Sequence, residues 1–208
     1  MAISRVVRPE LLDSLDPSDP SAIRSRNDLR VINAMMGNFA WAERKLAPFV
    51  ASETRLVEIG AGEGNLLRRL AKSLPPTDLT GIDLAPRPAN LPPSVTWKQG
   101  DLFQTLSGDV AVGVMIVHHF PDDRLKDLGQ LLQKFRAICL CEPWRHPLAR
   151  VWGRCLLPFV GPVTRHDMMI SIDAGFLPGE LPHLLGLDDW CIRETIDWRG
   201  SYRLVAWH

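Results

Sequence analysis

Hydrophobic runs and helical spacings alternate through the middle of the chain. Short hydrophobic runs of strand length occur at 55–59, 79–83, 95–98, 110–117 and 137–141. Between them, hydrophobic residues three and four positions apart predict helices at 65–73 and 122–135. The run at 110–117 is almost continuously apolar, which is typical of a central strand covered on both faces. This alternation predicts an α/β fold with right-handed crossovers and a mainly parallel sheet.

The N-terminal part of the chain has a different pattern. Residues 1–20 contain three prolines and several aspartates, so we expect an extended lead-in. A helix is predicted from Ser21 or Ser25 to a break at Gly37, and a second helix at 39–49. Because both precede the first strand, we expect them to cover the functional site or the edge of the sheet.

Two connections and the C-terminus complete the organisation. Residues 85–93 contain four prolines in nine positions, which predicts an irregular loop in place of a helix. An insertion at about 143–189 is rich in proline and glycine and is expected to be irregular. Segments 190–196 and 202–207 predict an antiparallel hairpin at the sheet edge. The chain is therefore divided into an N-terminal helical extension, 1–50, and an α/β domain, 51–208.

Composition and charge exclude several classes of protein. The 208 residues are 46% hydrophobic and 23% charged, as in ordinary globular domains. Lysine plus arginine equals aspartate plus glutamate at 24 each, so the basic excess typical of nucleic-acid-binding proteins is missing. No apolar run reaches the roughly 18 residues that a bilayer span needs, and Met1–Arg5 does not resemble a signal peptide. We therefore expect a cytoplasmic protein with no nucleic-acid partner and no stable membrane insertion.

The four cysteines do not indicate a metal centre. Cys139, Cys141, Cys155 and Cys191 show no repeated C-x-x-C spacing. Cys139 and Cys141 lie in a predicted strand, where small buried thiols are common in reducing compartments. The sequence therefore predicts no metal site.

The most informative stretch is a glycine-rich turn after the first strand. Gly60, Gly62 and Gly64 lie between that strand and the next predicted helix. Glycines at such a turn let the backbone approach a ligand closely, because no Cβ stands in the way. The strand before and the helix after make this a nucleotide-type loop.

The residues around this turn indicate which ligand it takes. The dinucleotide fingerprint G-x-G-x-x-G would need a glycine at position 65, which is Asn65. Glu58 and Glu63 flank the turn and would repel a diphosphate. They suit a ligand that has no phosphate and a cationic end, a description that S-adenosylmethionine fits.

Two aspartates follow the next two strands. Asp83 ends the second strand, 23 residues after Gly60, and can accept hydrogen bonds from both ribose hydroxyls. Asp101 follows the third strand and can accept from an adenine amino group. The neighbouring Leu84 and Leu102 could sandwich the adenine ring. Each aspartate alone could equally be a turn residue, but the three features together, in order at successive strand ends, favour a nucleoside site.

These motifs resemble those of the class I S-adenosylmethionine-dependent methyltransferases. The resemblance runs from about residue 55 to 142 and rests on Glu58-x-Gly-x-Gly-x-Gly, Asp83 and Gly100-Asp101. It implies a Rossmann-like three-layer sandwich with a seven-stranded sheet in the order 3-2-1-4-5-7-6 and strand seven antiparallel. The candidate cofactor-binding residues are Glu58, Gly60, Ala61, Gly62, Gly64, Asp83, Leu84, Asp101, Leu102 and Val117.

Candidates for catalysis follow the fourth strand. The segment Ile116-Val-His-His-Phe-Pro is similar to the His-His-Phe found there in many small-molecule methyltransferases. Because methyl transfer is an in-line displacement, an enzyme must align the acceptor and remove its proton, and histidine is a suitable base at neutral pH. His118 and His119 are therefore candidate bases, with a structural or cofactor-packing role as the alternative.

Further candidates lie in and before the insertion. Glu142 ends the fifth strand and is expected to bind or orient the acceptor. His166, beside Asp167, is a third candidate base, although Asp167 could instead cap a helix or close a turn. Arg165 and Trp152 are candidate acceptor contacts. The apolar stretch at 148–163 could form a lid helix, an apolar acceptor pocket or a membrane-surface patch.

The sequence as a whole predicts a methyltransferase that uses S-adenosylmethionine and acts on a small, apolar or aromatic acceptor, most simply at oxygen. An NAD-linked oxidoreductase is a second interpretation, which Asn65 and the flanking glutamates oppose. A non-catalytic or partner-activating protein that retains the fold is a third. The sequence does not specify an oligomeric state.

Overall fold

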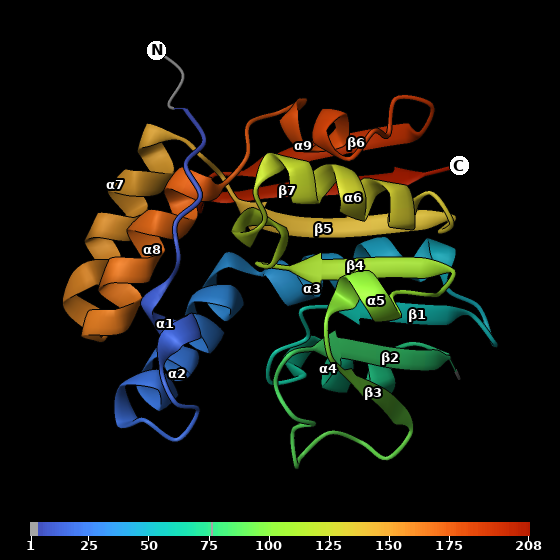
Figure 1. Ribbon diagram of the computed structural model, residues 1–208, viewed down its shortest axis with the longest axis horizontal. Helices are drawn as coiled ribbons and strands as arrows, with labels where there is room; N and C mark the ends of the chain where they lie inside the picture. The colour runs from blue at the N-terminus through green and yellow to red at the C-terminus, as the bar shows by residue number, and fades with distance from the viewer. Residues whose placement is uncertain (1–3, 76) are drawn as a thin grey trace.

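A computed structural model of the protein describes residues 4–75 and 77–208. The start of the chain, on which the signal-peptide prediction rests, includes residues 1–3 and lies partly outside the described residues. Within the described ranges a single sheet of seven strands is flanked by helices on both faces (Figure 1). The strands are β1 (Arg55–Ile59), β2 (Asp78–Asp83), β3 (Val95–Gln99), β4 (Val110–Val114), β5 (Ala137–Pro143), β6 (Cys191–Asp197) and β7 (Ser201–Trp207).

The sheet has the predicted order β3-β2-β1-β4-β5-β7-β6. Strands β1 to β5 pair in parallel, with Val57 opposite Thr80 on one side and Ala111 on the other. β7 pairs antiparallel with both β5 and β6. The central strands are buried along almost their whole length because helices cover both faces.

Each face of the sheet has its own hydrophobic core. On one face α6 (Asp122–Leu132) and α9 (Glu180–Leu184) bury side chains such as Leu128 and Leu181. On the other face α3 (Asn38–Leu46) and α4 (Asn65–Ser73) bury side chains such as Leu46 and Leu67. The short α5 (Leu102–Thr105) precedes β4. The three layers predicted from the sequence are therefore present.

The N-terminal segment ends up beside the carboxyl ends of the parallel strands. It forms α1 (Leu11–Ser14), α2 (Pro20–Met36), α3 and the 3-10 turn η1 (Ala47–Phe49). Asp19 caps α2 by accepting from the Ser21 N–H, and the left-handed Gly37 ends that helix at the predicted break. In Figure 1 the arrowheads of β2 and β4 point towards α1 and α2.

The insertion is more regular than the sequence suggested. It consists of α7 (Pro147–Leu156), the 3-10 turn η3 (Leu157–Phe159), α8 (Pro162–Ala174) and α9. The prolines that argued against helices stand at the first positions of α7 and α8, where their missing N–H costs nothing. Of the two longer helices, α8 packs against α1 and α2, and α7 packs against α8 (Figure 1).

The fourth strand is shorter than the predicted 110–117. It ends at Val114, and residues 117–119 form the 3-10 turn η2 (Val117–His119). Met115 takes a left-handed conformation with φ 57°, which a hydrophobic run cannot reveal. Within the described residues no helix combines the length and apolar composition that crossing a bilayer requires.

Candidate functional site

A cavity of about 820 Å³ lies between the carboxyl ends of the parallel strands and the helices α1, α2, α7 and α8. The glycine turn after β1, the end of β2 and the histidine turn η2 contribute to its wall. Ligands in open α/β sheets bind at this edge, because the loops that follow parallel strands converge there. The cavity is therefore the candidate site. Of the residues singled out from the sequence, it is lined by Glu58, Gly60, Ala61, Gly62, Glu63, Asn65, Asp83, His118, His119 and Trp152.

The glycine turn is shaped for close approach of a ligand. Gly60 has φ 63°, a conformation that residues with a side chain rarely adopt. A Cβ there would also lie 2.4 Å from Cγ1 of Ile116 and clash with it. Gly62 has φ 51°, and a Cβ there would meet no atom within 4 Å. The main chain at Gly62 therefore faces open space in the cavity wall.

Glu58 brings a carboxylate to the floor of the cavity. Its side chain is buried, and Oε2 has no hydrogen-bond partner among the described residues. Burial raises the pKa of Glu58 well above its usual range, since little in the protein stabilises the charge. A cationic group bound in the cavity would supply the missing partner.

Asp83 is held beside the glycine turn by two main-chain hydrogen bonds. The N–H of Gly62 donates to Oδ2 at 2.7 Å, and the N–H of Ala85 donates to Oδ1 at 2.8 Å. Each carboxylate oxygen keeps a second lone pair. Because Asp83 lines the cavity, these lone pairs are available to hydroxyl groups of a ligand.

The other predicted cofactor residues do not contribute to the cavity wall. Asp101 caps α5, accepting from the Phe103 N–H at 3.0 Å. Leu102 and Val117 are buried in the hydrophobic core, whereas Leu84 is 75% exposed. Gly64 forms the turn into α4. The cavity wall beyond Asp83 is formed instead by Ala85, Pro86 and Pro88.

The histidine pair forms part of the cavity wall. The turn η2 follows β4, which pairs with β1, and packs against α8. The side chain of His118 is 3% exposed and that of His119 is 25% exposed, and both line the cavity. The two rings lie 4.3 Å apart between centroids.

His118 is held by two carboxylates. Its Nδ1 lies 2.7 Å from Oε2 of Glu142, and its Nε2 lies 3.6 Å from Oε1 of Glu10. Burial by itself would lower the pKa of His118, but the interactions with Glu10 and Glu142 outweigh it and raise the pKa to about 9. Burial and the neighbouring His118 lower the pKa of His119.

Glu142 does not line the cavity. It is fully buried, and it accepts from the main-chain N–H groups of Ile116, Val117 and His118 in addition to the His118 ring. The side chain predicted to bind the acceptor is thus placed beneath the histidine turn, where it fixes the positions of the residues that do face the cavity.

The polar cluster at 164–167 ties the insertion to the N-terminal helices. Asp167 accepts from the N–H groups of Leu11 and Leu12, and so caps α1 from a different helix. Thr164 donates to Asp28 of α2. Arg165 donates to the Val160 carbonyl. Arg165 does not line the cavity.

His166, the third candidate base, also lies outside the cavity wall. Its side chain is 48% exposed, and its Nδ1 lies 2.9 Å from Oδ1 of Asp167. The structure therefore separates His166 from the pair His118 and His119.

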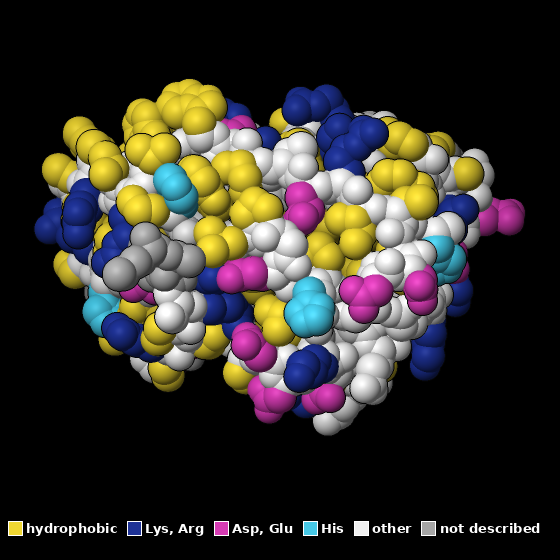
Figure 2. All heavy atoms as spheres, turned by 90° about the horizontal axis from the view of Figure 1, so that it is seen from above, with side chains coloured by type: hydrophobic (Ala, Val, Ile, Leu, Met, Phe, Trp, Pro, Cys, Tyr) yellow, Lys and Arg dark blue, Asp and Glu magenta, His cyan; other side chains and the backbone are white. Residues whose placement is uncertain are grey.

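The end of the cavity under the insertion is largely apolar. Trp152 of α7 lines it together with Trp198 of the β6–β7 turn, and their ring centroids are 5.2 Å apart. Figure 2 shows hydrophobic side chains gathered on the end of the molecule that α7 and α8 form. The stretch at 148–163 thus contributes to the cavity wall through Gly153 and Leu156, and exposes Leu148 and Phe159 on its outer side.

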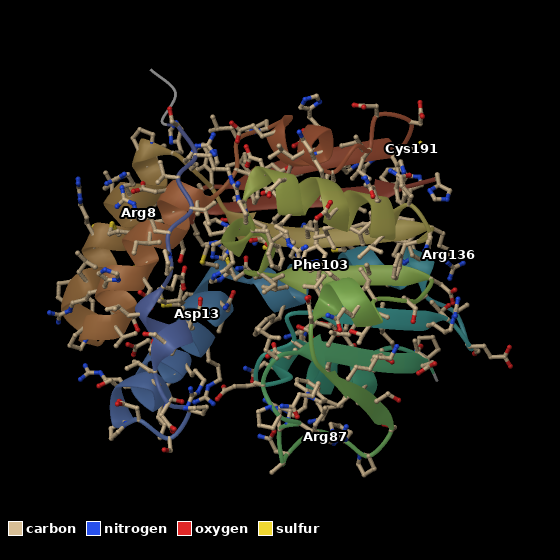
Figure 3. The ribbon with its side chains drawn as sticks, in the orientation of Figure 1. Arg8, Asp13, Arg87, Phe103, Arg136 and Cys191 are labelled. Carbon is tan, nitrogen blue, oxygen red and sulfur yellow. The ribbon has the colours of Figure 1, made fainter. Side chains whose placement is uncertain are left out.

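Three residues of the site gave no recognisable signal in the sequence. Glu10 and Asp13 line the cavity from the N-terminal segment, 105 or more positions before the histidines, and Figure 3 shows Asp13 on α1 facing the space between the helices and the sheet. Met115 lines it in its left-handed conformation. Only the folded chain brings these residues to the histidine turn.

Comparisons with known proteins agree with this architecture. No family model and no curated protein matches the sequence. Among solved structures, the plantazolicin methyltransferase BpumL in complex with a monoazolic desmethylPZN analog and SAH superposes with a TM-score of 0.70 at 15% identity, over 91% of each chain. Magnesium protoporphyrin IX methyltransferase from Synechocystis, with bound SAH, gives 0.61 at 18% identity over 92% of this chain and 90% of that one.

Human N-acetylserotonin methyltransferase in complex with SAM gives a TM-score of 0.59 at 14% identity, over 94% of this chain and 60% of that one. Sequence identities this low relate the proteins through their architecture and leave the acceptor unspecified. The superpositions, together with the strand order and the glycine turn, establish that this chain has the Rossmann-like fold of the class I methyltransferases.

Proposed function

We propose that the protein is an S-adenosylmethionine-dependent methyltransferase that acts on a small, largely apolar acceptor. The observation that carries the proposal is the buried Oε2 of Glu58, which has no partner among the described residues and lies in the wall of the cavity beside the glycine turn. A buried carboxylate oxygen without a partner is costly, and the ammonium of the cofactor's amino-acid end would supply that partner and balance the charge.

The neighbouring residues fit the rest of that cofactor. The open space at Gly62 admits a ligand against the main chain, and the free lone pairs of Asp83 suit two ribose hydroxyls. The flanking Glu63, which also lines the cavity, disfavours a diphosphate. S-adenosylmethionine, when bound, supplies an electrophilic methyl group on a sulfonium. BpumL and the Synechocystis enzyme, which share the fold, were crystallised with SAH.

The acceptor would lie at the other end of the cavity. There Trp152, Trp198, Leu156 and Ile172 offer flat and branched apolar surfaces. An aromatic or otherwise apolar acceptor would bury its surface against them, and its nucleophilic atom would lie near His118 and His119. Methylation at oxygen suits this arrangement, because a hydroxyl must lose its proton and the histidine turn is where polar groups gather.

Calorimetry with S-adenosylmethionine and with SAH tests the first half of the proposal. Binding of both with one site per chain is expected, and the absence of binding would overturn it. An isotopic methyl-transfer screen over phenols, hydroxylated polyketides and amines tests the second half. Tight cofactor binding without turnover on any acceptor would instead favour a non-catalytic or partner-activating protein.

A further inference from the structure

Three potential metal ligands from distant parts of the sequence meet in the cavity. Glu10 comes from the segment before α1, and His118 and His119 come from η2. One side-chain oxygen or nitrogen from each residue lies within 4.8 Å of the other two. All three side chains line the cavity. Nε2 of His118 lies 3.6 Å from Oε1 of Glu10, and the rings of His118 and His119 lie 4.3 Å apart between centroids.

Glu142 fixes the orientation of the His118 ring. In metal sites, a carboxylate that is not itself a ligand often plays this part by accepting from the other ring nitrogen of a metal-bound histidine. Oε2 of Glu142 lies 2.7 Å from Nδ1 of His118 and accepts the hydrogen on that nitrogen, so a bound ion would displace the proton on Nε2, which lies 3.6 Å from Oε1 of Glu10. Glu142 is itself fixed by three main-chain N–H groups and is fully buried. Such a supported imidazole is preorganised as a ligand, because its ring orientation is set before any ion arrives.

Glu10 and His119 also have supporting partners. The hydroxyl of Ser171 on α8 donates to Oε1 of Glu10. Oδ2 of Asp13 lies 3.6 Å from Nδ1 of His119, and the Asp13 side chain is 62% exposed. The three potential ligands are thus surrounded by polar groups that restrict their rotamers, in a cavity whose remaining wall is mostly apolar at that end.

We propose that Glu10, His118 and His119 bind one divalent transition-metal ion. Two imidazoles and one carboxylate on one side of an ion leave positions open towards the cavity, and this donor set suits zinc, iron, cobalt or nickel better than magnesium or calcium. The sequence predicted no metal site, since Glu10 lies more than a hundred positions from the histidines.

The ion would activate the acceptor, and in this respect the inference rests on the proposed methyl transfer. An acceptor hydroxyl that enters an open position becomes more acidic, as water does on zinc. Its proton leaves to solvent by way of the exposed Asp13 carboxylate. The oxygen then forms a bond to the methyl carbon while the carbon–sulfur bond breaks and its electron pair stays on sulfur. The acceptor class is accordingly a hydroxylated apolar compound, and the histidines act as ligands in place of bases.

Titration of the full-length protein with Co²⁺ tests the site without any methyl acceptor. After removal of metals with a chelator, we expect one Co²⁺ per chain, with visible absorption bands typical of nitrogen and oxygen ligands. Glu10→Gln, His118→Gln and His119→Gln should each weaken Co²⁺ binding at least about tenfold. His166→Gln is the matched control, because His166 is an exposed histidine outside the cavity, and it should bind as the parent does.

The outcomes separate this inference from the proposed function. Circular dichroism and SAH affinity of each variant establish that it is folded, and Glu10→Gln and His119→Gln keep the test decisive should His118→Gln fail to fold. No Co²⁺ binding, or equal binding by the ligand variants and the parent, overturns the metal site and points to a plain ion-pair cluster. In that case SAH binding would leave the methyltransferase proposal standing. Binding of one Co²⁺ per chain without binding of SAH would support the metal site and overturn the methyltransferase proposal.

Discussion

The carboxylate of Glu142 lies 2.7 Å from Nδ1 of His118, and the same side chain holds the main chain of the turn that carries this histidine. The strand β5 thereby fixes the loop after the neighbouring β4. Met115, the residue that starts this loop, is left-handed, and its N–H donates to the main-chain carbonyl of Cys141 in β5 at 2.8 Å. A strained backbone persists where surrounding hydrogen bonds determine it, and such positions cluster at functional sites.

Replacement of Glu142 by alanine should destabilise the protein. Three main-chain N–H groups, of Ile116, Val117 and His118, would lose their acceptor in a buried environment. We expect the free energy of unfolding to fall by about 2–4 kcal/mol, because unsatisfied buried donors are costly. Urea denaturation measures the change, with the exposed Asp189→Ala as control. A change below about 0.5 kcal/mol would show that water replaces the carboxylate there.

Glu58→Gln should weaken cofactor binding with little effect on folding. The amide keeps the shape of the side chain but cannot neutralise an ammonium, so we expect a loss of at least about tenfold in affinity for S-adenosylmethionine. The free energy of unfolding should change little, since Oε2 has no partner to lose and the amide keeps an oxygen that can accept from the main chain of Leu67. Calorimetry measures the affinity. Equal affinity in the two proteins would place the cofactor's ammonium elsewhere.

The same residue predicts a pH dependence of cofactor binding. Burial raises the pKa of Glu58 in the ligand-free protein, whereas a bound cation favours the ionised form. Binding should therefore release a proton, and affinity should rise with pH until the carboxyl of the free protein is fully ionised. Calorimetry in two buffers of different ionisation enthalpy detects the released proton. In Glu58→Gln this component should vanish, and its persistence there would assign the proton to another group.

Asp83→Ala should reduce the affinity for S-adenosylmethionine by about 1–3 kcal/mol, because buried ribose hydroxyls would lose their acceptor. The glycine turn would also lose the hydrogen bond from Gly62 to Asp83. Asp83→Asn keeps one acceptor oxygen and should show a smaller loss, which separates hydroxyl binding from the shape of the turn. Unchanged affinity in Asp83→Ala would mean that the adenosine does not lie against the end of β2.

The sequence predicted the parts of the structure that depend on local patterns. Strand order, the helix at 65–73 and the break at Gly37 follow from periodicity, glycine position and the family resemblance. The turn η2 was missed, because the apolar residues continue past Val114 whereas the extended conformation of the strand ends there. A run of apolar residues indicates that a segment is buried, but it does not distinguish a buried strand from a buried turn.

Long-range partners could not be predicted in this way. Asp167 was recognised as a candidate cap, but the helix that it caps, α1, starts 156 positions earlier. Glu10 lies in a segment whose prolines and aspartates indicated only an extended lead-in. Neither contact has a spacing signal, since the residues belong to elements that meet only after the sheet and the insertion have formed.

Asp197 provides a test of how the N-terminal helices are attached to the hairpin. Its carboxylate accepts from Arg199 at 2.7 Å and from Arg203 at 2.9 Å, and Arg199 in turn donates to the Met35 carbonyl of α2. The hydrogen bonds from Arg199 hold the pKa of Asp197 at about 2, against an ordinary 3.8. Because the pKa is lower in the folded protein, the stabilisation is present above about pH 4 and is lost as pH falls through 2.

Asp197→Asn should therefore lower the free energy of unfolding by about 1–2 kcal/mol at pH 6. The difference from the parent should shrink steadily below pH 4, since the parent's own carboxyl becomes protonated. Urea denaturation at pH 6, 4 and 2.5 measures both effects, and the exposed Asp188→Asn controls for the loss of one negative charge. A difference that stayed constant down to pH 2.5 would show that Asp197 stabilises the turn through its shape alone, with no contribution from its charge.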